Sequence, residues 1–114
     1  VLVRPQMAMR LAGHFGRAGR YYLYKVESPV RMWGRAVPAP HDRKLSFQVN
    51  VWFRGRWRDA GKIRDRIGRS SGVATDVIYP LRPARFRIRA IVSGAWDRLA
   101  SSSRWRYLRA VPSP

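Results

Sequence analysis

The stretch LSFQVNVWFRGRWRDAGKI, residues 45–63, decides the fold of this chain. In its first half every second side chain is apolar and the residues between are mostly polar, the apolar set being Leu45, Phe47, Val49, Val51 and Phe53. A period of two is typical of a β-strand that buries one face and exposes the other. Arg54-Gly55 then predicts a tight turn, and residues 56–63 predict the returning strand of a hairpin.

Short runs rich in Val, Ile, Phe, Tyr and Trp continue on both sides of this hairpin, separated by eight prolines and nine glycines. Such spacing is typical of an all-β domain. We predict loops over residues 13–19 and 94–103, and strands over residues 1–11, 21–26, 30–37, 45–53, 56–63, 73–79, 85–91 and 104–111.

The length of 114 residues is that of one domain, so we expect a single β-sandwich over residues 1–114. Pro5 favours an edge position, which makes residues 1–26 an additional N-terminal edge strand and loop. Residues 112–114 are expected to form a tail. Within this domain we predict an all-β, seven- to eight-stranded antiparallel Greek-key sandwich of immunoglobulin-like type. The alternative is a small barrel of OB or SH3-like type.

Alternation also predicts the buried side of the strands. Apolar residues that alternate with polar ones should face the core, as Phe86 and Ile88 do between arginines. The expected core comprises Leu45, Phe47, Val49, Val51, Trp57, Val77, Phe86, Ile88 and Tyr107.

The charge of the chain is extreme, because 24 Lys and Arg residues face six Asp and Glu residues and give a formal net charge of +18. Such a field attracts anionic polymers, acidic protein surfaces and nucleic acid. Lys25, Lys44 and Lys62 are the lysines, so 21 of the 24 cations are arginines. GC-rich coding sequence favours arginine, and this compositional bias is an alternative origin of part of the charge.

Arginines and tryptophans together form the candidate binding set, which lies in the central hairpin and the last two strands. Its members are Arg54, Arg56, Arg58, Arg85, Arg87, Arg89, Arg104, Arg106, Arg109, Trp52 and Trp105. Single-stranded nucleic-acid binders combine a basic groove with aromatic platforms of this kind. The other interpretation is the solvated face of an antiparallel sheet. Alternation slips at Trp105-Arg106-Tyr107-Leu108, which indicates a bulge, an edge position or an aromatic side chain left exposed for a ligand.

Residues for catalysis or metal binding are sparse. The sequence has two histidines, His14 and His41, and no cysteine. His41-Asp42 reads as a turn rather than an oriented base, since no nucleophile with matched spacing accompanies it. The acids are dispersed, and the pattern gives no carboxylate pair. We therefore predict no catalytic residue, no metal site and no cofactor.

The chain has no run of about 18 consecutive apolar residues, so we expect no membrane span. Arg4 and Arg10 interrupt the apolar character of the N-terminus, which is therefore unlike a signal peptide.

Residues 28–111 resemble the arginine-rich immunoglobulin-like or fibronectin-III-like β-sandwich domains of exported actinobacterial proteins. The resemblance is carried by SPVRMWGRAVPAP, KLSFQVNVWFRGRWRDAGKIR, RPARFRIRAIVSG and SSSRWRYLRAV. Ala84 replaces the usual turn glycine and Phe86 the usual tyrosine, so a tyrosine-corner hydrogen bond is not expected.

Such domains are commonly spacer, adhesive or accessory modules, and the resemblance implies no catalytic residue. We therefore expect a non-catalytic structural or binding module, extracellular or at the cell surface, whose charge attracts anionic polymers. The alternative is a cytoplasmic β-domain that binds nucleic acid through its arginine and aromatic surface.

Overall fold

The computed structural model describes residues 2–69 and 71–112, and the chain is all-β over these ranges. The described residues form ten strands and no helix. The strands are β1 (Gln6–Ala12), β2 (Gly16–Ala18), β3 (Tyr21–Lys25), β4 (Val30–Val37), β5 (Lys44–Phe53), β6 (Arg56–Arg66), β7 (Val73–Ile78), β8 (Ala84–Val92), β9 (Ser101–Ser102) and β10 (Arg106–Val111).

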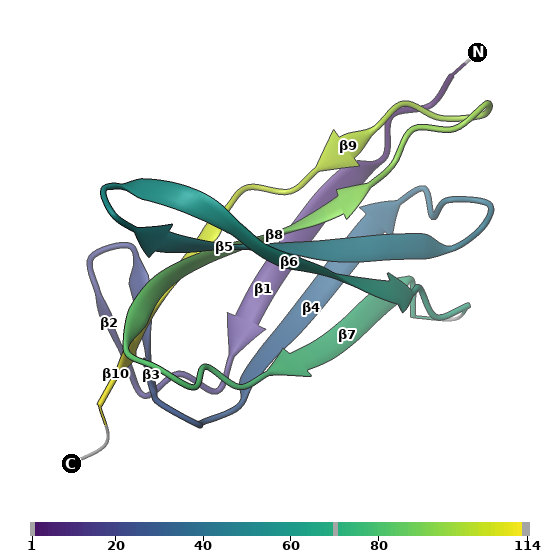
Figure 1. The fold of residues 1–114 in the computed structure, drawn as a ribbon. Helices are drawn as coiled ribbons and strands as arrows, with labels where there is room; N and C mark the ends of the chain where they lie inside the picture. The colour runs from purple at the N-terminus through teal and green to yellow at the C-terminus, as the bar shows by residue number, and fades with distance from the viewer. Residues whose placement is uncertain (1, 70, 113–114) are drawn as a thin grey trace.

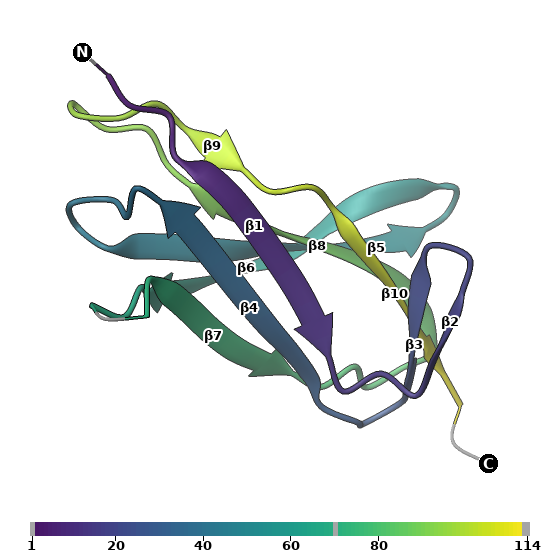
Figure 2. The same cartoon turned by 180° about the vertical axis from the view of Figure 1, so that it is seen from behind.

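The strands form two sheets, an arrangement compatible with a β-sandwich. The smaller sheet has the order β1-β4-β7, and the larger has the order β2-β3-β10-β8-β5-β6 with β9 paired to β8. Figure 1 shows the β5–β6 hairpin crossing in front of β1 and β4, and Figure 2 shows β1, β4 and β7 side by side from behind.

Two features of this arrangement differ from expectation. The described residues form ten strands rather than seven or eight, because β2 and β9 lie in segments predicted as loops. The sheets are also not purely antiparallel, because β10 pairs with β3 in parallel while its other neighbour, β8, runs antiparallel to it. The alternation of side chains along one strand does not show whether the neighbouring strand runs parallel or antiparallel. The sequence pattern therefore could not predict the parallel pair.

The central hairpin forms as its sequence predicts. Strands β5 and β6 pair from Lys44 opposite Arg66 to Phe53 opposite Arg56, with one bulge at Val49/Asn50. Arg54 and Gly55 form the turn with φ angles of 51° and 79°. Two consecutive positive φ angles match the right-handed twist of the flanking strands.

The core lies between the two sheets and confirms part of the predicted set. Leu45, Phe47, Val49 and Ile88 are buried. Phe86 is half-buried and packs against this core, as predicted, whereas Val51, Trp57 and Tyr107 are half-buried outside the core cluster, so their place in the core was wrongly predicted.

The N-terminal third contributes more to this core than its sequence indicates. Met9, Tyr24, Val30 and Met32 are all buried in it. The Tyr24 hydroxyl donates to the Ala12 carbonyl oxygen at 2.8 Å, and burial raises the pKa of Tyr24 to about 12. β1, which carries Met9, is an edge strand of the smaller sheet.

Strand β7 faces the core with the side opposite to the predicted one. Val77 is 39% exposed, whereas Ala74 is buried and Asp76 and Ile78 are half-buried. Hydropathy predicts that the face of Val77 is the buried one, because the opposite face carries the charged residue Asp76. The Asp76 carboxyl group lies beside Asp65 of β6, and its Oδ1 accepts the Val77 amide at 2.7 Å.

Strand β10 is likewise turned relative to the prediction. Leu108 and Ala110 are buried, and Tyr107 lies on the outer side of the sheet opposite Arg87. Trp105 and Tyr107 therefore share the outer face that their spacing suggests. Of the expected tail, Pro112 lies beyond β10 and is exposed, and residues 113–114 lie outside the described residues.

Candidate functional site

The outer face of the larger sheet gathers arginine and aromatic side chains from five strands. We call this surface the Arg–aromatic face. It comprises Tyr21, Trp52, Trp57, Arg85, Arg87, Arg89, Trp105, Tyr107 and Arg109. The members on β5 and β8 project outward because their neighbours Val49, Ile88 and Ala90 project into the core.

Aromatic rings form a continuous path across this face. Trp52 and Trp57 have centroids 5.3 Å apart, Trp57 and Tyr107 5.8 Å, and Tyr107 and Tyr21 5.9 Å. These separations are typical of favourable edge-to-face and tilted aromatic pairs. Trp52 is 40% exposed and leaves part of the path open to solvent.

Arg87 and Arg89 lie over the half-buried Trp105, with guanidinium carbons 4.1 and 4.4 Å from its ring centroid. Each is also fixed by an amide on β5. Arg87 Nε donates to Asn50 Oδ1 at 2.9 Å, and Arg89 Nε donates to Gln48 Oε1 at 2.8 Å. Trp105 is therefore not an open stacking platform, because Arg87 and Arg89 of the same chain lie over its ring.

Like charges are placed close together on this face. Arg85 lies directly opposite Arg109 on neighbouring strands, a pairing that destabilises a sheet. Arg20 adds a further guanidinium, 3.9 Å from the Tyr107 ring centroid. Within the described part of the chain, Arg98 is the only cation in an ion pair with a carboxylate. The arginines of the Arg–aromatic face thus stand without carboxylate partners among the described residues.

A polar hollow of about 670 Å³ continues this surface beyond Gln48. Its basic lining residues are Lys44, Lys62, Arg64, Arg66 and Arg98. They were absent from the candidate set predicted from sequence. The alternation of Lys62, Arg64 and Arg66 along β6 would have revealed three of them, had the predicted strand been extended past Ile63.

Asp42 closes the hollow at one end and is engaged with cations. Its carboxylate accepts hydrogen bonds from the Lys44 amide at 3.2 Å and from Arg98 Nη2 at 3.1 Å. Burial alone would raise the pKa of Asp42, but these hydrogen bonds outweigh it and hold the pKa below its usual value. Arg98 is itself buried and also donates to the Ser93 carbonyl oxygen.

The remaining predicted residues lie away from the Arg–aromatic face. Arg54 and Arg58 gather around Phe53 at the hairpin tip, with guanidinium carbons 5.2 and 5.7 Å from its ring centroid. Arg56 lies opposite Phe53 on β6. Arg106 turns toward the other sheet and donates to the Met9 carbonyl oxygen at 3.0 Å.

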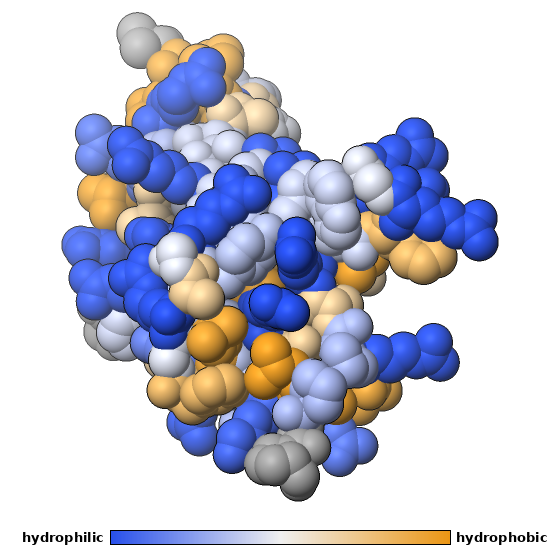
Figure 3. All heavy atoms as spheres, turned by 90° about the vertical axis from the view of Figure 1, so that its left-hand side faces the viewer, coloured by the Kyte–Doolittle hydropathy of each residue, from blue (hydrophilic) through white to orange (hydrophobic). Residues whose placement is uncertain are grey.

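Arg104, the last member of the predicted set, is exposed in the segment that precedes β10. The structure therefore brings together Trp52, Arg85, Arg87, Arg89, Trp105 and Arg109, and separates Arg54, Arg56, Arg58, Arg104 and Arg106 from them. Figure 3 shows hydrophilic residues over most of the end of the molecule it views, with apolar residues in the lower half.

One carboxyl pair forms that the sequence did not indicate. Burial, together with hydrogen bonding to and charge repulsion from Asp76, raises the pKa of Asp65 to about 6. Asp65 Oδ2 is buried without a hydrogen-bond partner among the described residues. The pair joins the inner faces of β6 and β7, the edge strands at which the two sheets meet.

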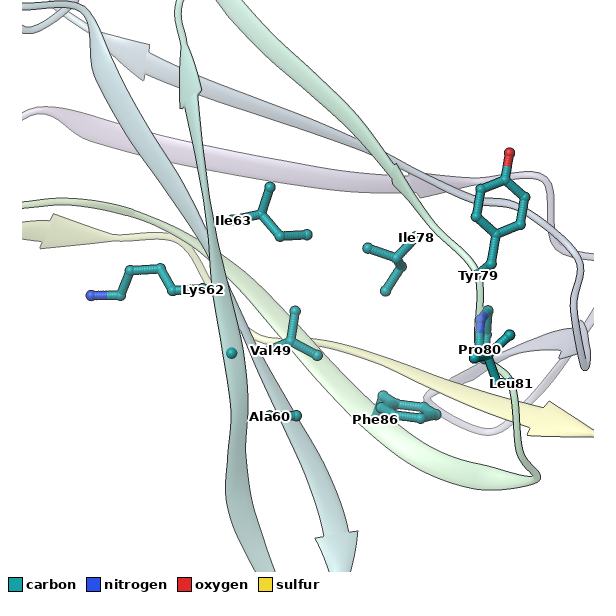
Figure 4. Close-up of a pocket in the computed structure, with 10 residues that line it drawn as sticks. Val49, Ala60, Lys62, Ile63, Ile78, Tyr79, Pro80, Leu81 and Phe86 are labelled. Atoms are coloured by element: carbon teal, nitrogen blue, oxygen red, sulfur yellow. The ribbon is translucent and has the colours of Figure 1, made fainter.

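An apolar cavity of about 370 Å³ opens near the same edge. Figure 4 shows Val49, Ile63, Ile78 and Phe86 directed toward its centre, while the Lys62 amine points away. This cavity belongs to the seam between the sheets and is distinct from the outward-facing Arg–aromatic face.

Among residues 2–69 and 71–112, no group of three or more His, Cys, Asp or Glu side chains is arranged to hold a metal ion. No helix in the same ranges has the length and apolar character needed to cross a membrane. No protein-family model and no curated protein matches this sequence.

Proposed function

We propose that this chain is a non-catalytic binding module that holds anionic polymers on its Arg–aromatic face. The observation that carries the proposal is the fixed pair of Arg87 and Arg89, which lacks carboxylate partners among the described residues. Arginines without carboxylate partners favour an anionic ligand from outside the chain, and Arg85 directly opposite Arg109 on the same face adds like-charge repulsion that such a ligand would offset. The polar hollow extends the same surface, and its exposed Lys44, Lys62, Arg64 and Arg66 give a long polymer more cations to contact.

The fold class that we propose for this module is an immunoglobulin-like or fibronectin-III-like Greek-key sandwich. Its support is the strand order, since β1-β4-β7 and β10-β8-β5 correspond to the A-B-E and G-F-C orders of immunoglobulin domains, with β6 added beside the C strand. The proposed place of action, at the cell surface or outside the cell, rests on the resemblance of residues 28–111 to exported domains.

Double substitutions on opposite sheets test this function. Affinities for heparin, polyglutamate and a single-stranded oligonucleotide are measured over a range of salt concentrations. We expect Arg85→Ala with Arg109→Ala to weaken heparin binding at least fivefold and to lower the salt slope by about two. The matched control is Arg31→Ala with Arg35→Ala on β4, which removes the same charge from the smaller sheet and should change affinity less than twofold.

Three outcomes would count against the proposal. Equal losses in the two double variants would mean that net charge alone governs attraction, and absence of binding to any polyanion would end the proposal outright. A steep preference for the oligonucleotide, lost in Trp52→Ala, would instead support nucleic-acid binding. We favour an anionic polymer other than nucleic acid, because arginines cover the Trp105 ring on which a base would stack.

A further inference from the structure

We infer that Arg87 and Arg89 form a subsite for phosphate or sulfate ester groups, recognised by directed hydrogen bonds as well as by charge. This inference rests on the proposed function, because it names the ligand chemistry of the same face. Both guanidinium groups are oriented by amide side chains, stack on Trp105 and lack carboxylate partners among the described residues.

Amide side chains fix the orientation of both guanidiniums. Gln48 lies opposite Arg89 and Asn50 lies opposite Arg87 on the neighbouring strand, and each amide oxygen accepts the Nε proton of its arginine. The Nη groups are the donors left to a ligand by these bonds. A guanidinium held in one orientation loses less conformational entropy on binding than a free one.

Trp105 provides the second support. Both guanidinium carbons lie against its ring, at 4.1 and 4.4 Å from the centroid, so at most about 8.5 Å separates them. Stacking on an indole is favourable for a guanidinium, which is weakly hydrated and planar. The ring thus contacts both like charges and acts as a positioning group for them.

Repulsion between the guanidinium groups of Arg87 and Arg89 favours the binding of an anion beside them. No carboxylate of the described residues lies within 4.0 Å of either guanidinium. Asp59, the acid opposite Asn50 on β6, uses its carboxylate to accept the Gly61 amide at 3.0 Å. An anionic ester group placed at Arg87 and Arg89 would offset their mutual repulsion, which is strongest where water is partly excluded.

The geometry of the donors favours tetrahedral esters over carboxylates. A carboxylate presents two oxygens in one plane, whereas a terminal phosphate or sulfate ester presents three that point in different directions. Because the Nε of each guanidinium is already bonded to an amide, the two groups can donate Nη protons to different oxygens of the three. Arginine is the preferred residue for such fixed contacts, and lysine supplies only a point charge.

Charge-conserving variants test the subsite. Arg87→Lys with Arg89→Lys is compared with the control Arg31→Lys with Arg35→Lys, so every protein keeps its net charge. The probes are dextran sulfate, dextran phosphate and polyglutamate at one salt concentration. We expect the Arg87 and Arg89 variant to lose at least fivefold in affinity for dextran sulfate, dextran phosphate or both, and less than twofold for polyglutamate. The ester whose binding falls further identifies the ligand.

The results that overturn the subsite are distinct from those that overturn the proposed function. Two results would contradict the subsite: equal affinities of the two lysine variants for every probe, or a loss of affinity for polyglutamate as large as that for the esters. Either result would still allow a face that binds polyanions through charge alone. Circular dichroism at the start confirms that each variant has kept its fold.

A second variant tests the positioning role of Gln48. Gln48→Ala should weaken ester binding about threefold while leaving the salt slope unchanged, because no cation is removed. A purely structural role for Gln48 predicts a lower unfolding temperature with unchanged affinity, and that result would contradict the inference.

Discussion

At the scale of single residues, Asp65 and Asp76 bring two carboxyl groups together in a chain with only six acids and 24 cations. The folded state binds a proton at Asp65 more tightly than the unfolded chain does, because its pKa is raised from 3.8 to about 6. The stabilising effect of this proton is complete below pH 3.8 and is lost as the pH rises through 6.

Substitution of Asp65 by Asn should therefore stabilise the protein near neutral pH. After allowance for solvent screening, we expect a gain on the order of 1 kcal/mol at pH 7 that disappears near pH 4. Urea unfolding at both pH values measures it, with Glu27→Gln at an exposed position as the control for a change of net charge. An equal effect of Asp65→Asn at both pH values would show that the carboxyl pair does not govern it.

At the scale of strands, the sequence pattern predicts β4 and β5 well, because each alternates and ends at a turn or a proline, and it predicts the start of β6 from the Arg54-Gly55 turn. It fails for β7 and β10, where the wrong face was assigned to the core. The exceptions have physical causes. A carboxyl pair occupies the inner face of β7, and Trp105 and Tyr107 on β10 find arginines and other aromatic rings outside the core.

Truncations on β10 distinguish its two faces. Leu108→Ala should cost about 2–5 kcal/mol, because Leu108 is fully buried and its removal leaves a cavity. Tyr107→Ala should cost about 1 kcal/mol, since the ring is only half-buried on the outer face. Thermal or urea unfolding measures both, and a larger cost for Tyr107→Ala would place that ring in the core.

At the scale of the whole molecule, composition predicts attraction to anions but not the surface that provides it. The sequence placed arginines of the hairpin tip and of β10 in one candidate set, whereas the fold separates Arg58 and Arg106 from Arg87 and Arg89. It also left out Lys44, Arg64 and Arg66, because their contribution depends on the length and register of β6. Both errors concern contacts between strands, and such contacts cannot be predicted from the alternation of side chains within one strand.

The central claim is that anions bind the outer face of the larger sheet, and chemical-shift mapping by NMR tests it most directly. ¹⁵N-labelled protein is titrated with short heparin fragments while amide, indole and arginine Nε–H signals are followed. We expect the largest shifts at Gln48, Asn50, Arg87, Arg89 and the Trp105 indole. Arg10, Arg31 and Arg35 on the smaller sheet serve as the internal comparison, and shifts there equal to or larger than those at Arg87 and Arg89 would contradict the account.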